Sequence, residues 1–115
     1  MPSVVKLFDG EVIPNGTTVT RALSVNGYAY AAVEETNDQT IDFNLTGSVE
    51  DAAARVPLLT LENNATQTRT GLTATMNGRV YVLPLRKVLR TLTVSVTNKS
   101  GGADATVHVW VSLAS

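Results

Sequence analysis

Cysteine is absent from the 115-residue chain, and charged residues make up only 17% of it. Without cysteine the fold contains neither disulfides nor a thiolate metal site, which suits assembly in a reducing cytoplasm. The nine basic and ten acidic residues give a net charge of −1. Because binding to phosphates normally requires a basic surplus, we expect no nucleic-acid partner.

Long hydrophobic runs are also missing. No apolar run approaches the roughly 20 residues of a membrane-spanning helix. The first residues, Met1–Lys6, lack the charged and apolar regions of a signal peptide. We therefore expect no membrane partner and no secretion signal. Hydrophobic residues still make up 43% of the chain, enough for one core. The length fits a single domain over residues 1–115.

Period-two alternation is the dominant pattern that is present. Thr91–Thr97 places Leu92, Val94 and Val96 on one face and Thr or Ser on the other, as only a strand does. Ala105–Leu113 repeats the pattern with valines. A polar, glycine-bearing segment lies between the two runs, so we expect them to pair as a hairpin.

The same signal predicts further strands, broken by Asp-Gly or Asn-Gly pairs that favour tight turns. One predicted turn is Asp9–Gly10, between Ser3–Phe8 and Glu11–Ile13. Another is Asn26–Gly27, after which Tyr28–Val33 returns along Thr17–Val25. Asn77–Gly78 separates the last two of the remaining predicted strands, which are Thr40–Thr46, Val56–Leu61, Thr70–Met76 and Arg79–Leu85. Only Val49–Arg55 favours a helix, of a turn or two.

Eight or nine short strands at about 10-residue spacing predict an all-β fold. We expect an antiparallel β-sandwich that is jelly-roll-like. Periodicity does not reveal strand order, so an immunoglobulin-like topology stays open.

Candidate catalytic and metal-binding residues are isolated. The single histidine, His108, lies between Val107 and Val109, and we interpret it as a surface or interface residue. Glu34, Glu35, Asp38 and Asp42 suggest a polar loop between strands, with a weak calcium site as the residual possibility. We expect no enzyme activity, no catalytic residues, no metal site and no cofactor.

Two groups of side chains are candidates for binding. Tyr28, Tyr30 and Trp110 share one strand parity and could form an outward platform for stacking sugars. Alternatively, these aromatic residues cap the core or anchor a subunit interface. Candidate interface residues are a basic cluster, an apolar N-terminal segment that could form an arm over residues 1–8, and the tryptophan: Arg86, Lys87, Arg90, Val4, Val5, Leu7, Phe8 and Trp110.

A longer pattern in the C-terminal half resembles a known family. The stretch Gly78–Gly101 reads GRVYVLPLRKVLRTLTVSVTNKSG, and ATVHVWV follows from Ala105. This order of strands around a Thr-Asn-x-Ser-Gly turn resembles small structural proteins of tailed bacteriophages. Thr17–Leu23 and Ile41–Leu45 are also similar, whereas the segment from Ser48 departs from the Ser-x-Asp-Gly turn of many relatives.

The resemblance implies a non-enzymatic virion protein. We expect foremost a capsid decoration (cement) protein that binds the phage head and stabilises it, with a head-fibre or tail component as the next possibility. The implied partners are the major capsid protein or other virion proteins, in a homo-oligomer for which we expect a trimer. The implied location is the virion, after assembly in the host cytoplasm. A carbohydrate-binding sandwich is the alternative.

Overall fold

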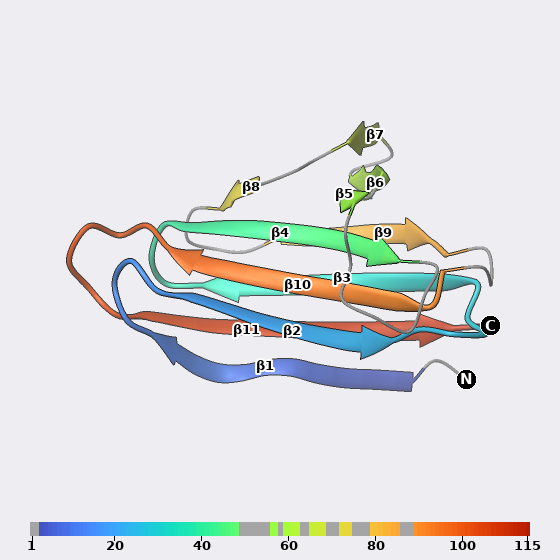
Figure 1. The fold of residues 1–115 in the computed structure, drawn as a ribbon, viewed down its shortest axis with the longest axis horizontal. Helices are drawn as coiled ribbons and strands as arrows, with labels where there is room; N and C mark the ends of the chain where they lie inside the picture. The colour runs from blue at the N-terminus through green and yellow to red at the C-terminus, as the bar shows by residue number, and fades with distance from the viewer. Residues whose placement is uncertain are drawn as a thin grey trace.

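Two antiparallel sheets pack face to face in the computed structural model, which describes residues 3–48, 56–57, 59–62, 65–68, 72–74, 79–85 and 89–115 (Figure 1). The six-stranded sheet has the order β1 (Ser3–Ile13), β11 (Ala105–Ala114), β3 (Tyr30–Asn37), β9 (Arg79–Pro84), β6 (Leu59–Glu62) and β7 (Ala65–Thr68). The five-stranded sheet has the order β2 (Thr18–Ser24), β10 (Thr91–Asn98), β4 (Ile41–Ser48) and β5 (Val56–Pro57), with β8 (Leu72–Ala74) also paired to β4.

Successive long strands alternate between the two sheets. β1, β3, β9 and β11 belong to one layer, and β2, β4 and β10 belong to the other. This wrapping of the chain around the sandwich is the jelly-roll arrangement, so the predicted all-β class and sandwich are confirmed. No helix that could span a membrane occurs in the part of the chain that the structure describes.

The core forms where the alternating apolar side chains of both sheets meet. Leu92, Val94 and Val96 of β10 are fully buried, as are Val107, Val109 and Val111 of β11. Phe8, Ile41 and Phe43 fill the remaining volume of the same cluster. Burying each such side chain contributes about 1.5–3 kcal/mol, so the burial of this apolar core is the main favourable contribution to stability.

The predicted pairing of β10 with β11 is wrong. β10 pairs with β2 and β4, whereas β11 pairs with β1 and β3 in the opposite sheet. The same error affects Tyr28–Val33, because β3 does not return along β2. Alternation indicates which face of a strand is buried, but it does not indicate which strands lie beside it. Two consecutive alternating strands can therefore pair in one sheet or lie in two facing sheets. The intervening loops are long enough to cross the roughly 10 Å between sheets.

The predicted turn at Asp9–Gly10 is a bulge within a continuous strand. β1 runs from Ser3 to Ile13 against β11, and its register shifts once between Lys6 and Phe8 and again between Asp9 and Glu11. Gly10 has a φ of +69°, the left-handed conformation that a glycine bulge requires. The glycine therefore kinks the edge strand instead of reversing it.

The central segment contains more strands than predicted, giving eleven within the described residues. The single run Val56–Leu61 is divided, because β5 pairs with β4 and β6 pairs with β9 in the other sheet. β7 has the sequence Ala-Thr-Gln-Thr, which carries no apolar alternation to predict it. Val49–Arg55 and Asn77–Gly78 lie outside the described residues.

Candidate functional site: the outer face of the six-stranded sheet

The two outer faces of the sandwich differ in chemistry. Six large hydrophobic side chains are exposed in the part of the chain with described side chains, and the register places all of them on the outside of the six-stranded sheet. They are Val4, Val12, Tyr30, Val80, Val82 and Trp110. Monomeric proteins rarely expose several large apolar side chains together, so this surface, called here the outer face, is the candidate site.

The opposite surface is hydroxyl-rich. On the outside of the five-stranded sheet, the hydroxyl groups of Thr18 and Thr97 lie 2.6 Å apart. Those of Thr20 and Ser95 lie 2.8 Å apart across the same strand pair. These cross-strand hydrogen bonds stabilise the sheet, and Thr18 and Thr20 are exposed. Among the side chains that the structure describes, the large exposed apolar ones are therefore confined to the outer face.

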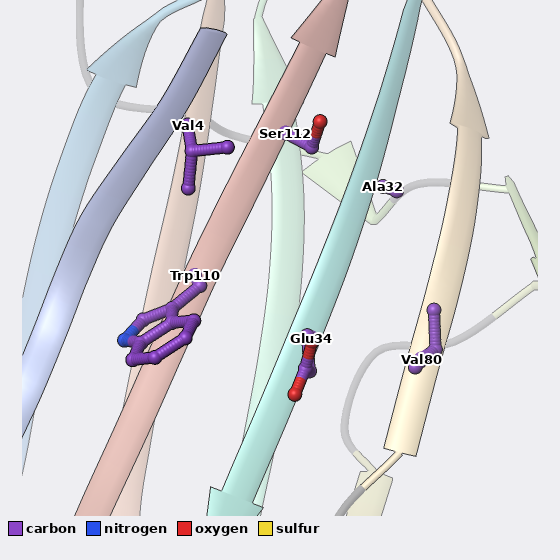
Figure 2. A pocket seen from close by; sticks show the side chains of 6 residues that line it. All are labelled: Val4, Ala32, Glu34, Val80, Trp110 and Ser112. Carbon is purple, nitrogen blue, oxygen red and sulfur yellow. The ribbon is translucent and has the colours of Figure 1, made fainter. Parts of the chain in front are cut away.

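One row of side chains crosses the middle of the outer face. Lys6, Trp110, Glu34 and Val80 stand on four adjacent strands, each directly opposite the next in the ladder. The Lys6 Nζ atom lies 5.2 Å from the centre of the Trp110 ring, within reach of a cation–π contact. In Figure 2 the indole leans from β11 towards β1, while Glu34 and Val80 lie on its other side. Trp110 thus separates a cation from an anion.

Two hollows of about 210 Å³ flank this row. One is mainly apolar and is lined by the six residues in Figure 2: Val4, Ala32, Glu34, Val80, Trp110 and Ser112. The other is lined by Glu34, Thr36, His108 and Trp110. Pockets for drug-sized molecules have volumes of about 300–1,000 Å³, so each hollow fits a side chain or a single sugar ring.

His108 anchors the bulge of β1 to this face. Its Nδ1 atom accepts a hydrogen bond from the backbone N–H of Gly10 at 3.1 Å. The imidazole also meets the Trp110 ring edge-on, with the ring centres 6.3 Å apart. An accepting Nδ1 leaves the proton of the neutral ring on Nε2. The side chain is 42% exposed, as predicted for a surface histidine.

The predicted interface and stacking residues are distributed unevenly. Val4, Tyr30 and Trp110 lie on the outer face with exposures of 62%, 56% and 37%. Phe8 is fully buried in the core, so the interface prediction for this residue was wrong. Tyr28 is partly buried and packs against the core. The reason for Phe8 is the bulge at Leu7, which shifts the parity of β1 and turns the ring inward.

The rest of the predicted arm is also part of the sandwich. Val5 and Leu7 are half-buried, and Leu7 packs against the core. Ser3–Phe8 belongs to β1, so these residues do not form a free arm. Arg90 is exposed beside the start of β10, where its backbone N–H donates to Ser48. Arg86 and Lys87 lie outside the described residues.

The predicted acidic loop is largely strand. Glu34 and Glu35 are in β3, and Asp42 is in β4, which leaves only Asp38–Thr40 as the connection. Glu34 points outward, whereas Glu35 is fully buried. Because consecutive strand residues face opposite sides, these two carboxylates cannot hold one ion. No group of three potential metal ligands occurs among the described residues.

The sequence did not predict that Arg21 bridges the two sheets at the edge formed by β1 and β2. This side chain reaches from β2 to β1, where it donates to the Leu7 carbonyl at 2.8 Å and to the Glu11 carboxylate at 2.9 Å. Its guanidinium carbon also lies 4.8 Å from the centre of the Phe8 ring. A bridged, bulged edge is poorly suited to pairing with a neighbour's strand. Contacts with other molecules are therefore better made through the outer face.

Val80 and Val82 were missed as well, although the sequence carries a signal for them. The run from Val80 to Leu83 is apolar at every position, so both faces of that strand are apolar. Leu83 points into the core and is 1% exposed, which leaves Val80 and Val82 outside at 54% and 43%. A continuous apolar run in an antiparallel sheet thus indicated a surface that something else could cover.

No known protein-family model matches the sequence, and neither does any curated protein. Solved structures do share the fold. SPBc2 prophage-derived protein YomS superposes with a TM-score of 0.68 at 12% identity, over 97% of this chain and 93% of that one. PBSX exported protein XepA gives a TM-score of 0.71 at 13% identity, over 98% of this chain but only 37% of XepA.

The VP2 protein of infectious bursal disease virus, from derived T=1 particles, gives a TM-score of 0.57 at 10% identity, over 99% of this chain and 31% of VP2. Identities this low show a shared fold alone. The β-sandwich seen here therefore occurs in prophage-derived and viral proteins, over essentially the whole chain.

Proposed function

We propose that the chain is a non-enzymatic structural protein of a phage virion, foremost a capsid decoration protein that binds the head and stabilises it. The observation that carries this proposal is the concentration of exposed apolar side chains on the outer face, opposite a hydroxyl-rich face. A protein that works by packing against others needs such a surface and needs no catalytic centre. The likeness to prophage-derived sandwiches supports the same role.

Sedimentation with phage heads tests the role directly. The chain is incubated with undecorated heads of the phage that encodes it. The heads, with any bound protein, are then sedimented by centrifugation. We expect saturable binding and a higher temperature of head disruption. Free protein in the supernatant at saturating heads would overturn the decoration role, and binding to purified tails instead would identify a tail component.

Two surface variants locate the contact. Val82→Asp places a charge on the outer face, where the valine is 43% exposed. Ala22→Asp places the same charge on the exposed opposite face. Burying an unpaired carboxylate is costly, so we expect Val82→Asp to weaken head binding about tenfold or more. Ala22→Asp should bind like the unmodified protein; equal losses would exclude the outer face as the contact.

Carbohydrate binding is a second candidate, favoured by the hollow between Trp110 and His108. An exposed indole beside a carboxylate, a hydroxyl and an imidazole offers an apolar platform and polar groups, which match the two sides of a sugar ring. Sugars should then raise the melting temperature, and Trp110→Ala or Thr36→Ala should abolish that shift. Tyr30→Ala should retain it, because Tyr30 lies four residues from Glu34, about 13 Å along β3. An unchanged melting temperature across a sugar panel would remove this candidate.

A further inference from the structure

The charges on the outer face are arranged in a self-complementary way. Lys6 and Glu34 are both exposed, and each is the direct cross-strand neighbour of Trp110. Neighbouring strands are about 4.8 Å apart, so the backbone positions of Lys6 and Glu34 stand at similar distances on either side of β11. A surface with opposite charges placed evenly about a centre matches a copy of itself.

Symmetry determines which copy-to-copy arrangement uses this pattern. A two-fold axis lying between two facing sheets and running along β11 exchanges the β1 side of one copy with the β3 side of the other. Lys6 then faces Glu34 of the second copy, twice, and the two Trp110 side chains meet at the centre. An axis across the strands would instead place Lys6 on Lys6 and Glu34 on Glu34, which repel.

The side chains in the two rows next to the Trp110 row are compatible with the axis along β11. Val4 and Ala32 flank β11 one row further along, opposite Ser112, so Val4 of one copy would face Ala32 of the other. Asp9 and Thr36 flank His108 in the row on the other side, and their juxtaposition brings no like charges together. The strands of the two copies would run nearly parallel, as in aligned sheet packing.

We propose that the outer face binds a second copy of this chain, in a two-fold dimer that pairs Lys6 with Glu34 across a central Trp110 pair. This inference rests on the proposed function in that it names the partner of the same surface. β9 is two strands from β11, whereas β1 is the edge strand on the other side. Val80 and Val82 of each copy therefore extend past the partner's β1 and stay open for the phage head. The proposed dimer differs from the trimer expected at the start.

Charge reversal tests the arrangement with the full chain alone. In Lys6→Glu both intermolecular pairs become Glu–Glu, and in Glu34→Lys both become Lys–Lys. We expect each variant to dimerise at least about tenfold more weakly than the unmodified protein in sedimentation equilibrium. When the two variants are mixed in equal amounts, a Lys6→Glu chain can pair with a Glu34→Lys chain, and both contacts then join opposite charges. The mixture should therefore form a heterodimer with an affinity near that of the unmodified dimer.

Matched controls exclude effects on folding and net charge. Ala22→Glu introduces a carboxylate on the opposite face and should dimerise normally, and all variants should keep their melting temperature within a few degrees. Trp110→Ala should weaken the dimer as a central contact does, by about tenfold or more. A monomer at all concentrations, unaffected charge variants, or a mixture without recovery would each overturn the proposal. Because no phage head is present, such a failure leaves the head-binding result to judge the proposed function separately.

Discussion

The side-chain amide of Asn98 is fully buried where the β1–β2 and β10–β11 connections meet. Its Nδ2 group donates to the Ile13 carbonyl at 2.8 Å and to the Ala103 carbonyl at 2.7 Å. Its Oδ1 atom accepts from the backbone N–H of Ser100 at 2.8 Å. One side chain therefore satisfies backbone groups of two loops that are distant in sequence.

Replacing this amide should cost a large part of the stability. In Asn98→Asp the donor becomes an oxygen, which leaves two carbonyls without a partner and places like partial charges together. We expect a loss of about 2–4 kcal/mol in the free energy of unfolding, measured by urea denaturation. Asn15 is the matched control: it is exposed, and its Oδ1 accepts from Gly101, a bond that aspartate retains. Asn15→Asp should change stability by less than about 0.5 kcal/mol, and a similar loss in both variants would contradict this account.

Single-residue roles of this kind were largely beyond prediction from the sequence. Asn98 is recognisable as a turn residue, but its burial depends on Ile13, which lies 85 positions away. The role of Arg21 was equally difficult to predict. Its side chain points inward from an edge strand, and its partners are known only once β1 is placed near β2. Trp110 was predicted as a binding residue, since a large aromatic between outward polar residues is a local signal.

At the scale of elements, β1 shows how a strand can break its own alternation. The bulges at Leu7 and Gly10 allow Phe8 and Ile13 to enter the core while Lys6 and Val12 stay outside. Without the extra residue Leu7, Lys6 and Phe8 would share a face, and without Gly10, Phe8 and Ile13 would lie on opposite faces. Gly10 is therefore required because its backbone φ is positive, and the space that a side chain would occupy is a smaller constraint.

Gly10→Ala tests the second bulge. An added Cβ would lie 3.5 Å from His108 Cε1, an ordinary contact, so the cost comes from the positive φ of +69°. We expect a loss of about 1–2 kcal/mol in the free energy of unfolding. Gly102→Ala serves as the comparison, because its Cβ meets nothing within 4 Å and its φ is not in the left-handed range. It should cost no more than about 0.5 kcal/mol, and equal costs would argue against strain at the bulge.

Strand existence was more predictable than strand partnership. The long strands β2, β4, β10 and β11 were located from alternation to within two residues at each end, because burial of one face leaves a period of two. Which sheet each strand joins depends on loops that cross the core, and these have no distinctive local pattern. Short strands such as β7 pair through backbone groups alone, which every sequence carries.

At the scale of the whole molecule, the first strand is a structural part of the sandwich. Ser3, Val4, Val5, Lys6 and Phe8 each pair with a residue of β11, and Phe8 is fully buried. The two layers of the sandwich were predicted from the periodicity. The integration of residues 1–8 was not, because an apolar segment before a glycine resembles an extension.

Deleting residues 1–8 should therefore destabilise the fold. Loss of Phe8 alone removes about 3–5 kcal/mol, and the unpaired edge of β11 adds to this. We expect the melting temperature in calorimetry to fall by more than about 10 °C. Val4→Ala, at an exposed position of the same strand, should leave it within a few degrees. An unchanged melting temperature after the deletion would contradict the core role of β1.

The ladder between β1 and β11 places Ser3 opposite Leu113. The start of β1 and the end of β11 consequently lie side by side at one end of the sandwich (Figure 1). A short linker could join them, and the exposed Gly101–Gly102 loop at the other end could be opened, giving a circularly permuted chain with every strand pairing intact. Cargo fused ahead of Ser3 or after Ala114 would leave the sandwich at the same end, along the strands.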